Sequence, residues 1–415
     1  MVEHNGYFYF AISAVVGLYL LDLVANWLNV SALQPEPPGE FKEVFSADKY
    51  AESQQYLKTN TRFDYVSDFV SLAIFLAFWL MGGFGMLDEF IRGFGYGEIV
   101  NGLLFMFVLF VAQLLISIPF ELYHTFVIEE KFGFNKTTIG TWASDQVKGL
   151  VLAVVIGAPI LALMLWLFGE FGKQAWLYAW ISMTAVTLLL TYLGPSLIMP
   201  LFNKFEPLEE GELKTEIDGL AAKCDFPLTE VSVMDGSKRS AKTNAFFTGF
   251  GKNKKIALFD TLIEKHSVPE LVAVLAHEIG HYKKKHIIQG MVIGILKLGV
   301  ISFLIYLFMN NQGLVEAFGV KQASVYCSFV FFFILFKPIS FVLSIGMSML
   351  SRKNEFEADA YAAEVTGGSE DMISALKQLP KDNLSNLTPH PFYAFLFYSH
   401  PPIIERLAAL RRLGS

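Results

Sequence analysis

The sequence predicts an all-α protein that crosses a membrane seven times and carries a mainly helical polar domain with a small β-sheet. Of the 415 residues, 53% are apolar and only 17% are charged, a composition that soluble globular proteins do not have. Seven long and nearly uncharged stretches approach the ~20 residues that an α-helix needs to cross a bilayer. Two polar segments with strand and helix patterns predict the polar domain.

The expected spans divide the chain into four parts. In order, the apolar stretches cover residues 6–28, 66–87, 101–120, 149–168, 175–200, 288–310 and 326–350. The parts are transmembrane helices 1 to 5 with their inner loops (1–200), an inner polar segment (201–290), helices 6 and 7 (291–350) and a C-terminal polar segment (351–415). The polar segments are the candidates for chemistry.

The distribution of basic residues predicts how the chain lies in the membrane. With the N-terminus outside, 27 of the 32 lysines and arginines fall in inner segments, as the positive-inside rule requires. Segment 201–290 holds 13 basic and 13 acidic residues, so it offers no basic surface and we expect no nucleic-acid partner. The C-terminus and both polar segments are therefore expected inside, and membrane lipid is an expected partner.

Two lysines, Lys297 and Lys337, lie within expected spans. A charge in lipid is costly, so both are expected to face water, and Pro338 is expected to shape the last span because proline lacks a backbone donor. Charges within spans are also typical of transporters and channels, which keeps that class open.

The inner segment predicts short strands followed by a helix. Residues 230–236 and 244–262 show strand patterns joined by glycine turns. Ser267 and Glu270 have the spacing of a capping box with a proline between them, which predicts a helix that begins there. That helix would run into LAHEIGHYKKKH (275–286).

This stretch contains the pattern HExxH. His277 and His281 are four residues apart, so on a helix both imidazoles project from one face and can bind a single Zn²⁺. Glu278 is adjacent and can act as the general base on a metal-bound water. The pattern predicts one catalytic zinc ion per chain.

A third protein ligand is expected from NEFEADAYA (354–362), on the same side of the membrane. Glu355 and Asp359 are also four residues apart, so one can bind the metal while the other holds a ligating histidine. Glu357 points elsewhere on that helix, which we expect to be a short helix of its own on the inner face.

Six ordered motifs resemble the CAAX prenyl protease 1 family of polytopic zinc metalloendopeptidases. They are FVIEEKFGFNKTT (126–138), PLFNKFEPL (200–208), TNAFFTGFGK (243–252), HEIGH (277–281), NEFEADAYA (354–362) and YSHPPIIERL (398–407). The resemblance covers nearly the whole chain. It implies seven helices that enclose a large water-filled chamber, with the zinc site at its inner end.

The resemblance also implies roles for individual residues. It makes His277, His281 and Glu355 the zinc ligands and Glu278 the base. With Glu355 as a ligand, the helix spacing leaves Asp359 as the residue that orients a ligating histidine. The strand that starts at Asn244, Ala245 and Phe246 would pair with a substrate peptide, as extended peptides add to strand edges. His400 and Arg406 would donate to the developing oxyanion. His286 is expected to be structural, and His390 to be a turn residue.

The expected function is cleavage near the C-terminus of prenylated CAAX-type or other small membrane-associated peptides. The tail LRRLGS lacks a dilysine signal and a CAAX box, from which we expect a bacterial inner-membrane member with its active site on the cytoplasmic side. The alternatives are a heat-shock-type quality-control protease, an intramembrane protease, or a transporter or channel with a structural zinc site. The first would have about four spans and a shorter chain, and the second would bury HExxH within a span, whereas here YKKKH follows the motif. Glu278 separates a peptidase from the third, because a structural zinc site has no use for a base.

Overall fold

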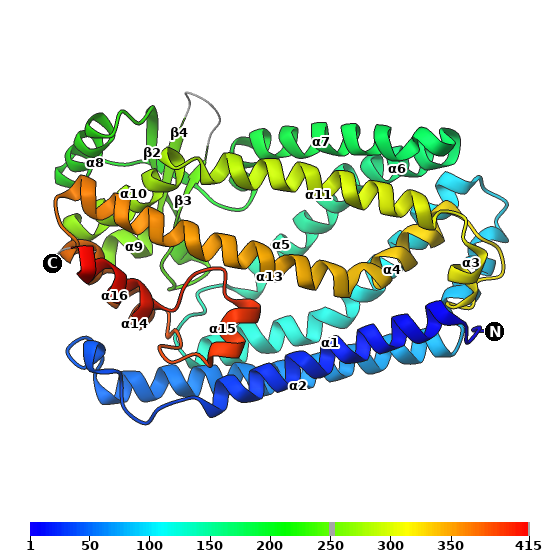
Figure 1. Ribbon diagram of the computed structural model, residues 1–415, viewed down its shortest axis with the longest axis horizontal. Helices are drawn as coiled ribbons and strands as arrows, with labels where there is room; N and C mark the ends of the chain where they lie inside the picture. The colour runs from blue at the N-terminus through cyan, green and yellow to red at the C-terminus, as the bar shows by residue number, and fades with distance from the viewer. Residues whose placement is uncertain (249–253, 414–415) are drawn as a thin grey trace.

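The computed structural model describes residues 1–248 and 254–413. The molecule is elongated, its long helices run along the long axis, and its two termini lie at opposite ends (Figure 1). Seven helical stretches in the described part of the chain are long and apolar enough to span a membrane, which confirms the predicted number. They are α1 (Gly6–Ser31), α2 (Ala47–Leu80), α4 (Glu98–Tyr123) with the π-turn after it, α5 (Ile139–Leu152) continued by α6 (Ala158–Glu170), α7 (Ala175–Leu193), α11 (His286–Phe308) and α13 (Val325–Thr366).

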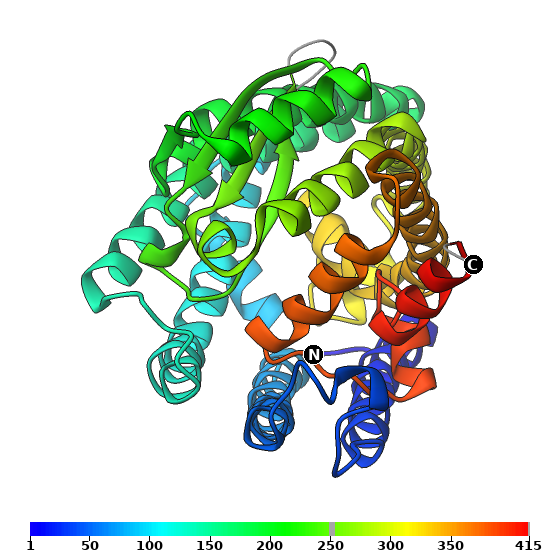
Figure 2. The same cartoon turned by 90° about the vertical axis from the view of Figure 1, so that its left-hand side faces the viewer.

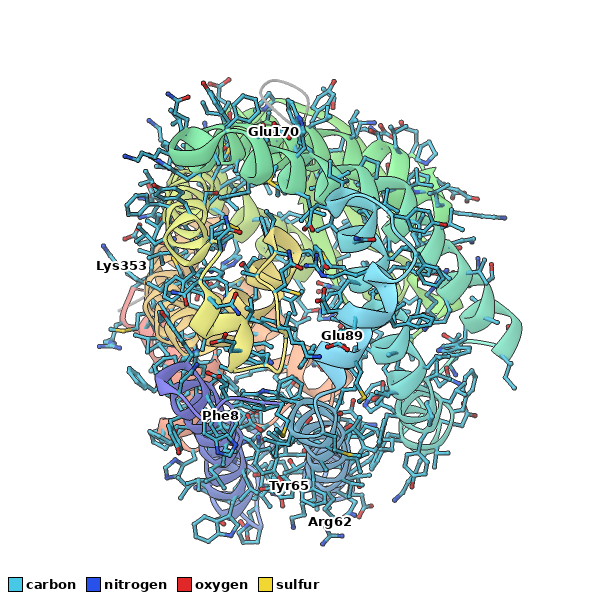
Figure 3. The ribbon with its side chains drawn as sticks, turned by 90° about the vertical axis from the view of Figure 1, so that its right-hand side faces the viewer. Phe8, Arg62, Tyr65, Glu89, Glu170 and Lys353 are labelled. Atoms are coloured by element: carbon cyan, nitrogen blue, oxygen red, sulfur yellow. The ribbon has the colours of Figure 1, made fainter. Side chains whose placement is uncertain are left out.

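Viewed along the long axis, these helices form a ring (Figure 2). From the opposite end, the long side chains of Arg62 and Lys353 point outward from it (Figure 3). Many apolar side chains on the spans are exposed, as lipid-facing side chains are, among them Phe69, Val155 and Leu296. The large chamber that the resemblance implies stays a prediction.

The second span differs from the hydropathy prediction of 66–87. The helix α2 already ends at Leu80, and a short amphipathic helix, α3 (Gly83–Arg92), follows it. Gly82 lies between them with φ 78°, a left-handed conformation that glycine adopts at little cost and that stops an α-helix. Hydropathy averages over this two-residue break and therefore shifted the span toward the C-terminus.

The last span also differs, because α13 is one continuous helix of 42 residues. Ser324 accepts a hydrogen bond from the Cys327 backbone at its start, and Gly367 ends it with φ 84°. No glycine or proline lies between residues 350 and 362, so the helix continues out of the apolar stretch. The separate short helix expected for residues 354–362 is therefore the C-terminal part of α13.

A polar domain covers one end of the ring. Its sheet has the order β1–β2–β4–β3, in which β2 and β4 are parallel and β3 is an antiparallel edge strand. The strands β2 and β4 confirm the strand patterns, and the expected glycine turn at 249–253 lies outside the described residues. The strands are β1 (Phe205–Pro207), β2 (Leu228–Met234), β3 (Ala245–Thr248) and β4 (Lys254–Phe259), and the helices are α8 (Glu212–Lys223), α9 (Asp260–Lys265), α10 (Val268–Lys283), α14 (Glu370–Asp382), α15 (Pro391–Phe397) and α16 (Ile403–Leu413), with α12 (Gln312–Glu316) at the other end.

The helix α10 lies between the sheet and α13 and carries the HExxH residues. The predicted capping box is present, with the Ser267 and Glu270 side chains each bonded to the other residue's backbone. The helix ends at Lys283, and Lys285 has φ 62°, a left-handed conformation that is costly for a residue with a Cβ. A new helix, α11, begins at His286.

We expect Lys297 and Lys337 to face water, and thiol labelling checks this. Lys297 is half-buried and Lys337 is exposed in the structure. Lys297→Cys and Lys337→Cys should react with a membrane-impermeant maleimide in intact vesicles, against a low background because Cys224 and Cys327 are buried. Leu296→Cys is the control, because Leu296 is exposed next to Lys297 and is apolar, as lipid-facing residues are. Labelling of the Leu296 variant alone would contradict the prediction.

Candidate metal centre

Two helices bring the candidate ligands together because their backbones approach closely. A Cβ added at Gly280 of HEIGH would lie 3.1 Å from both the Cα and the carbonyl oxygen of Ala358 on α13, closer than ordinary contacts allow. Glycine on one helix and alanine on the other therefore permit α10 and α13 to pack in contact. This packing places Glu355 of α13 against His277 and His281 of α10.

The three donor atoms form a compact triangle. The Nε2 atoms of His277 and His281 are 3.1 Å apart, and they lie 3.5 and 3.3 Å from the carboxylate oxygens of Glu355. Tetrahedral Zn²⁺ with bonds of about 2.0–2.1 Å separates its ligand atoms by about 3.3–3.4 Å. Two imidazoles and one carboxylate at this spacing fit a zinc site that keeps a fourth position open.

Asp359 contacts His277 on the ring nitrogen that faces away from the triangle, and Arg406 in turn contacts Asp359. The Nδ1 atom of His277 lies 2.8 Å from Oδ1 of Asp359, which is 1% exposed. Arg406 donates to both oxygens of Asp359, at 2.8 and 2.6 Å, and its Nη1 lies 3.3 Å from Glu355. Burial alone lowers the pKa of His277, but the hydrogen bonds to Asp359 and Glu355 outweigh burial and raise the pKa to about 9.

This pKa predicts how zinc binding depends on pH. In the metal-free protein His277 carries a proton on both ring nitrogens at neutral pH. The proton on Nε2 must leave before Nε2 can bind a metal. The apparent zinc affinity should therefore rise with pH from 7 to about 9 and then level off, with release of one proton from this group. Competition with a chromophoric chelator at several pH values measures it, and an affinity independent of pH over this range would contradict the prediction.

The other two predicted residues lie beside the triangle. His400 is 65% exposed, and its Nε2 lies 3.5 Å from Oε1 of Glu355. Arg406 is buried, and its guanidinium is engaged by Asp359 and Glu355. The structure thus shows Arg406 as a residue that positions carboxylates, while its role as an oxyanion donor stays a prediction.

Glu278 borders a cavity of about 770 Å³ next to the triangle. His281 and Ala245 line the same cavity. Further lining residues come from the ends of α7, α11 and α13 nearest the polar domain: Thr191, Ile287, Gln289, Met347 and Asn354. A peptide in this cavity would reach the candidate base and the metal ligands together.

The strand β3 forms one edge of the sheet at this cavity. Asn244 is exposed directly before the strand, and its carbonyl accepts from the Phe259 backbone at 3.2 Å. The Phe246 backbone pairs with Ala257, and its side chain lies outside the described residues. Since β4 occupies only one side of β3, the other side offers backbone groups to a peptide.

The motif FVIEEKFGFNKTT supports the segment that leads into β3. Lys242 Nζ lies 2.8 Å from a carboxylate oxygen of Glu129 in the motif. The Asn135 backbone bridges to Ser240, and the Lys136 backbone donates to the carbonyl of Arg239 at 3.0 Å. The motif is recognisable in the sequence, but this contact is not, because the two segments lie about 100 residues apart.

The fold and the site together define a membrane-embedded metallopeptidase of the HExxH type. A family model for the N-terminal part of CAAX prenyl proteases, with five membrane helices, matches residues 26–204, and one for peptidase family M48 matches residues 207–413. The chain belongs to the CAAX prenyl protease 1 family of membrane zinc metalloendopeptidases, as its sequence motifs predict.

Individual relatives are similar to this chain along nearly its whole length. The CAAX prenyl protease 1 homolog of Arabidopsis thaliana is 35% identical over 413 residues, which are 95% of each chain. The CAAX prenyl protease 1 of Saccharomyces cerevisiae is 35% identical over 400 residues, covering 90% of this chain and 88% of the yeast protein. The crystal structure of S. mikatae Ste24p matches with a TM-score of 0.92 at 33% identity, covering 98% of this chain and 100% of that one. These matches do not favour the heat-shock-type and transporter alternatives.

Proposed function

We propose that the chain uses one Zn²⁺, held by His277, His281 and Glu355, to hydrolyse peptide bonds near the C-terminus of small membrane-associated peptides. The convergence of two imidazole nitrogens and a carboxylate oxygen beside Glu278, in a cavity bordered by a strand edge, is the observation that carries the proposal. Bound zinc would lower the pKa of water and polarise a substrate carbonyl.

The protein's own residues have distinct tasks in this proposal. Glu278 takes the proton of the attacking water and returns it to the leaving amine. Asp359 accepts a hydrogen bond from Nδ1–H of His277, so that Nε2 faces the metal, and Arg406 holds Asp359 in place. His400, exposed beside Glu355, donates to the oxygen on which negative charge develops.

The strand edge and the names of the relatives support the substrate class. A peptide that pairs with the backbone of Asn244, Ala245 and Phe246 presents its scissile carbonyl in a fixed register. The relatives in A. thaliana and S. cerevisiae are named CAAX prenyl proteases, which supports prenylated CAAX-type peptides as substrates. The cavity beside the site is lined by Ile287 and Met347, and apolar side chains of this kind suit a lipidated peptide.

The proposed orientation has the N-terminus outside and the active site on the cytoplasmic side. It is supported by the basic residues of the inner segments and by the termini at opposite ends of the molecule. A bacterial inner membrane as its location stays a prediction, since the relatives described above come from eukaryotes.

The test uses two peptides of one sequence, one prenylated at a cysteine near its C-terminus and one not. The purified protein in liposomes should cleave the prenylated peptide several-fold faster, with the cut near the C-terminus by mass spectrometry. Glu278→Gln protein should cleave both peptides at least about a hundredfold more slowly than wild type. Cleavage of both at equal rates would remove prenylation from the proposal, and zinc-independent cleavage would overturn the mechanism.

A further inference from the structure

A second chain of hydrogen bonds leads away from the proposed metal position, starting at His281. The Nδ1 atom of His281 lies 3.1 Å from Nδ1 of His286, and Nε2 of His286 lies 3.2 Å from Oε2 of Glu357. We propose that His286 and Glu357 are positioning residues that fix the tautomer and the ring orientation of His281. The proposal rests on the ligand set of the proposed function.

Each proton in this chain has one consistent position. If Nε2 of His281 binds the metal, its Nδ1 carries the hydrogen and donates to Nδ1 of His286. The Nδ1 atom of His286 then carries no hydrogen, so its Nε2 does and donates to the carboxylate of Glu357. Exchanging the tautomer of one ring alone would place two hydrogens or none between the imidazoles. Exchanging both would leave a hydrogen on Nε2 of His281, which could then not bind a metal.

The backbone shows how His286 comes to lie against His281. On a continuous helix, residues five apart would point about 140° away from each other. The break after Lys283 and the left-handed Lys285 instead turn the chain so that the two rings meet edge to face, with centroids 5.1 Å apart. A non-glycine residue at φ 62° is costly, and such conformations gather at functional sites.

The two proposed histidine ligands are therefore held differently. His277 contacts a carboxylate directly, and that carboxylate, Asp359, is buried. His281 contacts a carboxylate only through the ring of His286, and that carboxylate, Glu357, is 41% exposed. Because Glu357 is further from the metal and partly screened by water, its effect should be smaller than that of His286.

Zinc affinity of the full-length protein in detergent tests the proposal, by competition with a chelator. His286→Ala should weaken it about 10–100-fold, as loss of an outer hydrogen-bond partner of a metal ligand typically does. His286→Asn, whose side-chain oxygen can accept near the Nδ1 position, should restore most of the affinity and guards against loss of folding. Glu357→Ala should cost less than His286→Ala, and the double variant should equal His286→Ala, because both residues act through one chain.

Lys353→Ala is the matched control. Lys353 lies 3.6 Å from the other oxygen of Glu357 and points outward from the ring (Figure 3), so its loss removes an ion pair of the same carboxylate away from His286. It should leave zinc affinity unchanged. His286→Ala within twofold of wild type, or His286→Asn as weak as His286→Ala, would overturn the inference. Zinc retained by Glu355→Ala would instead overturn the ligand set of the proposed function.

Discussion

Glu278→Gln protein should keep its zinc and its fold and lose about a hundred- to ten-thousandfold of the wild-type turnover. The side chain borders the cavity next to His281, and it is not among the three donor atoms of the triangle. Its amide can neither take the proton of water nor return it to the leaving amine, so the change removes general acid-base catalysis and leaves coordination in place. Peptide turnover and metal content, measured on the same preparation, check the expectation.

An exposed glutamate on α8 supplies the control for this prediction. Glu216→Gln changes the same charge at a distance from the cavity and should leave turnover unchanged. Turnover of the Glu278 variant within tenfold of wild type would contradict the role of the base. Loss of zinc from that variant would show instead that Glu278 helps to hold the metal.

Three substitutions on α13 should rank its acidic residues by their zinc content. Glu355→Ala should lose the ion, because Glu355 is buried and its oxygens lie within 3.5 Å of both proposed histidine ligands. Glu357→Ala should retain it, since Glu357 lies about 200° around the helix from Glu355 and its carboxylate pairs with His286 and Lys353. Asp359→Asn should fall between them, with affinity or activity about 10–100-fold lower.

Elemental analysis of the three proteins after one round of dialysis against a weak chelator decides the order. Thermal unfolding of the same samples, with and without added zinc, separates metal loss from general destabilisation. A Glu357 variant without zinc beside a Glu355 variant that keeps it would reverse the ligand assignment.

Much of the fold and of the candidate site follows from local sequence patterns. The seven spans, the capping box before α10 and the spacing of His277, Glu278 and His281 depend only on neighbouring residues, which sequence periodicity reports. Glu355 and Asp359 could also be predicted from the sequence, because residues four positions apart on a helix lie on the same face.

The contacts that sequence reasoning missed depend on single backbone conformations or on distant segments. His286 meets His281 because Lys285 is left-handed, and no residue type in LAHEIGHYKKKH announces that conformation. The hydrogen bond from Arg406 to Asp359 joins α16 to α13 between residues that are 47 positions apart in the sequence. The continuity of α13 was missed for a different reason. The apolar stretch ends where the polar residues begin, whereas the helix continues through them.

The single helix α13, which runs through the last apolar stretch and on past Glu355, has a mechanical consequence. At 1.5 Å per residue its 42 residues extend about 63 Å, and the proposed ligand lies only five residues beyond the apolar stretch, with no flexible joint between them. A helix changes its tilt when the hydrocarbon thickness of the bilayer changes. Tilting α13 would displace Glu355 relative to α10 unless the contact between Gly280 and Ala358 carries both helices together. Zinc should therefore dissociate at different rates from the same protein in thin and in thick bilayers, and equal rates would mean that α10 and α13 move as one body.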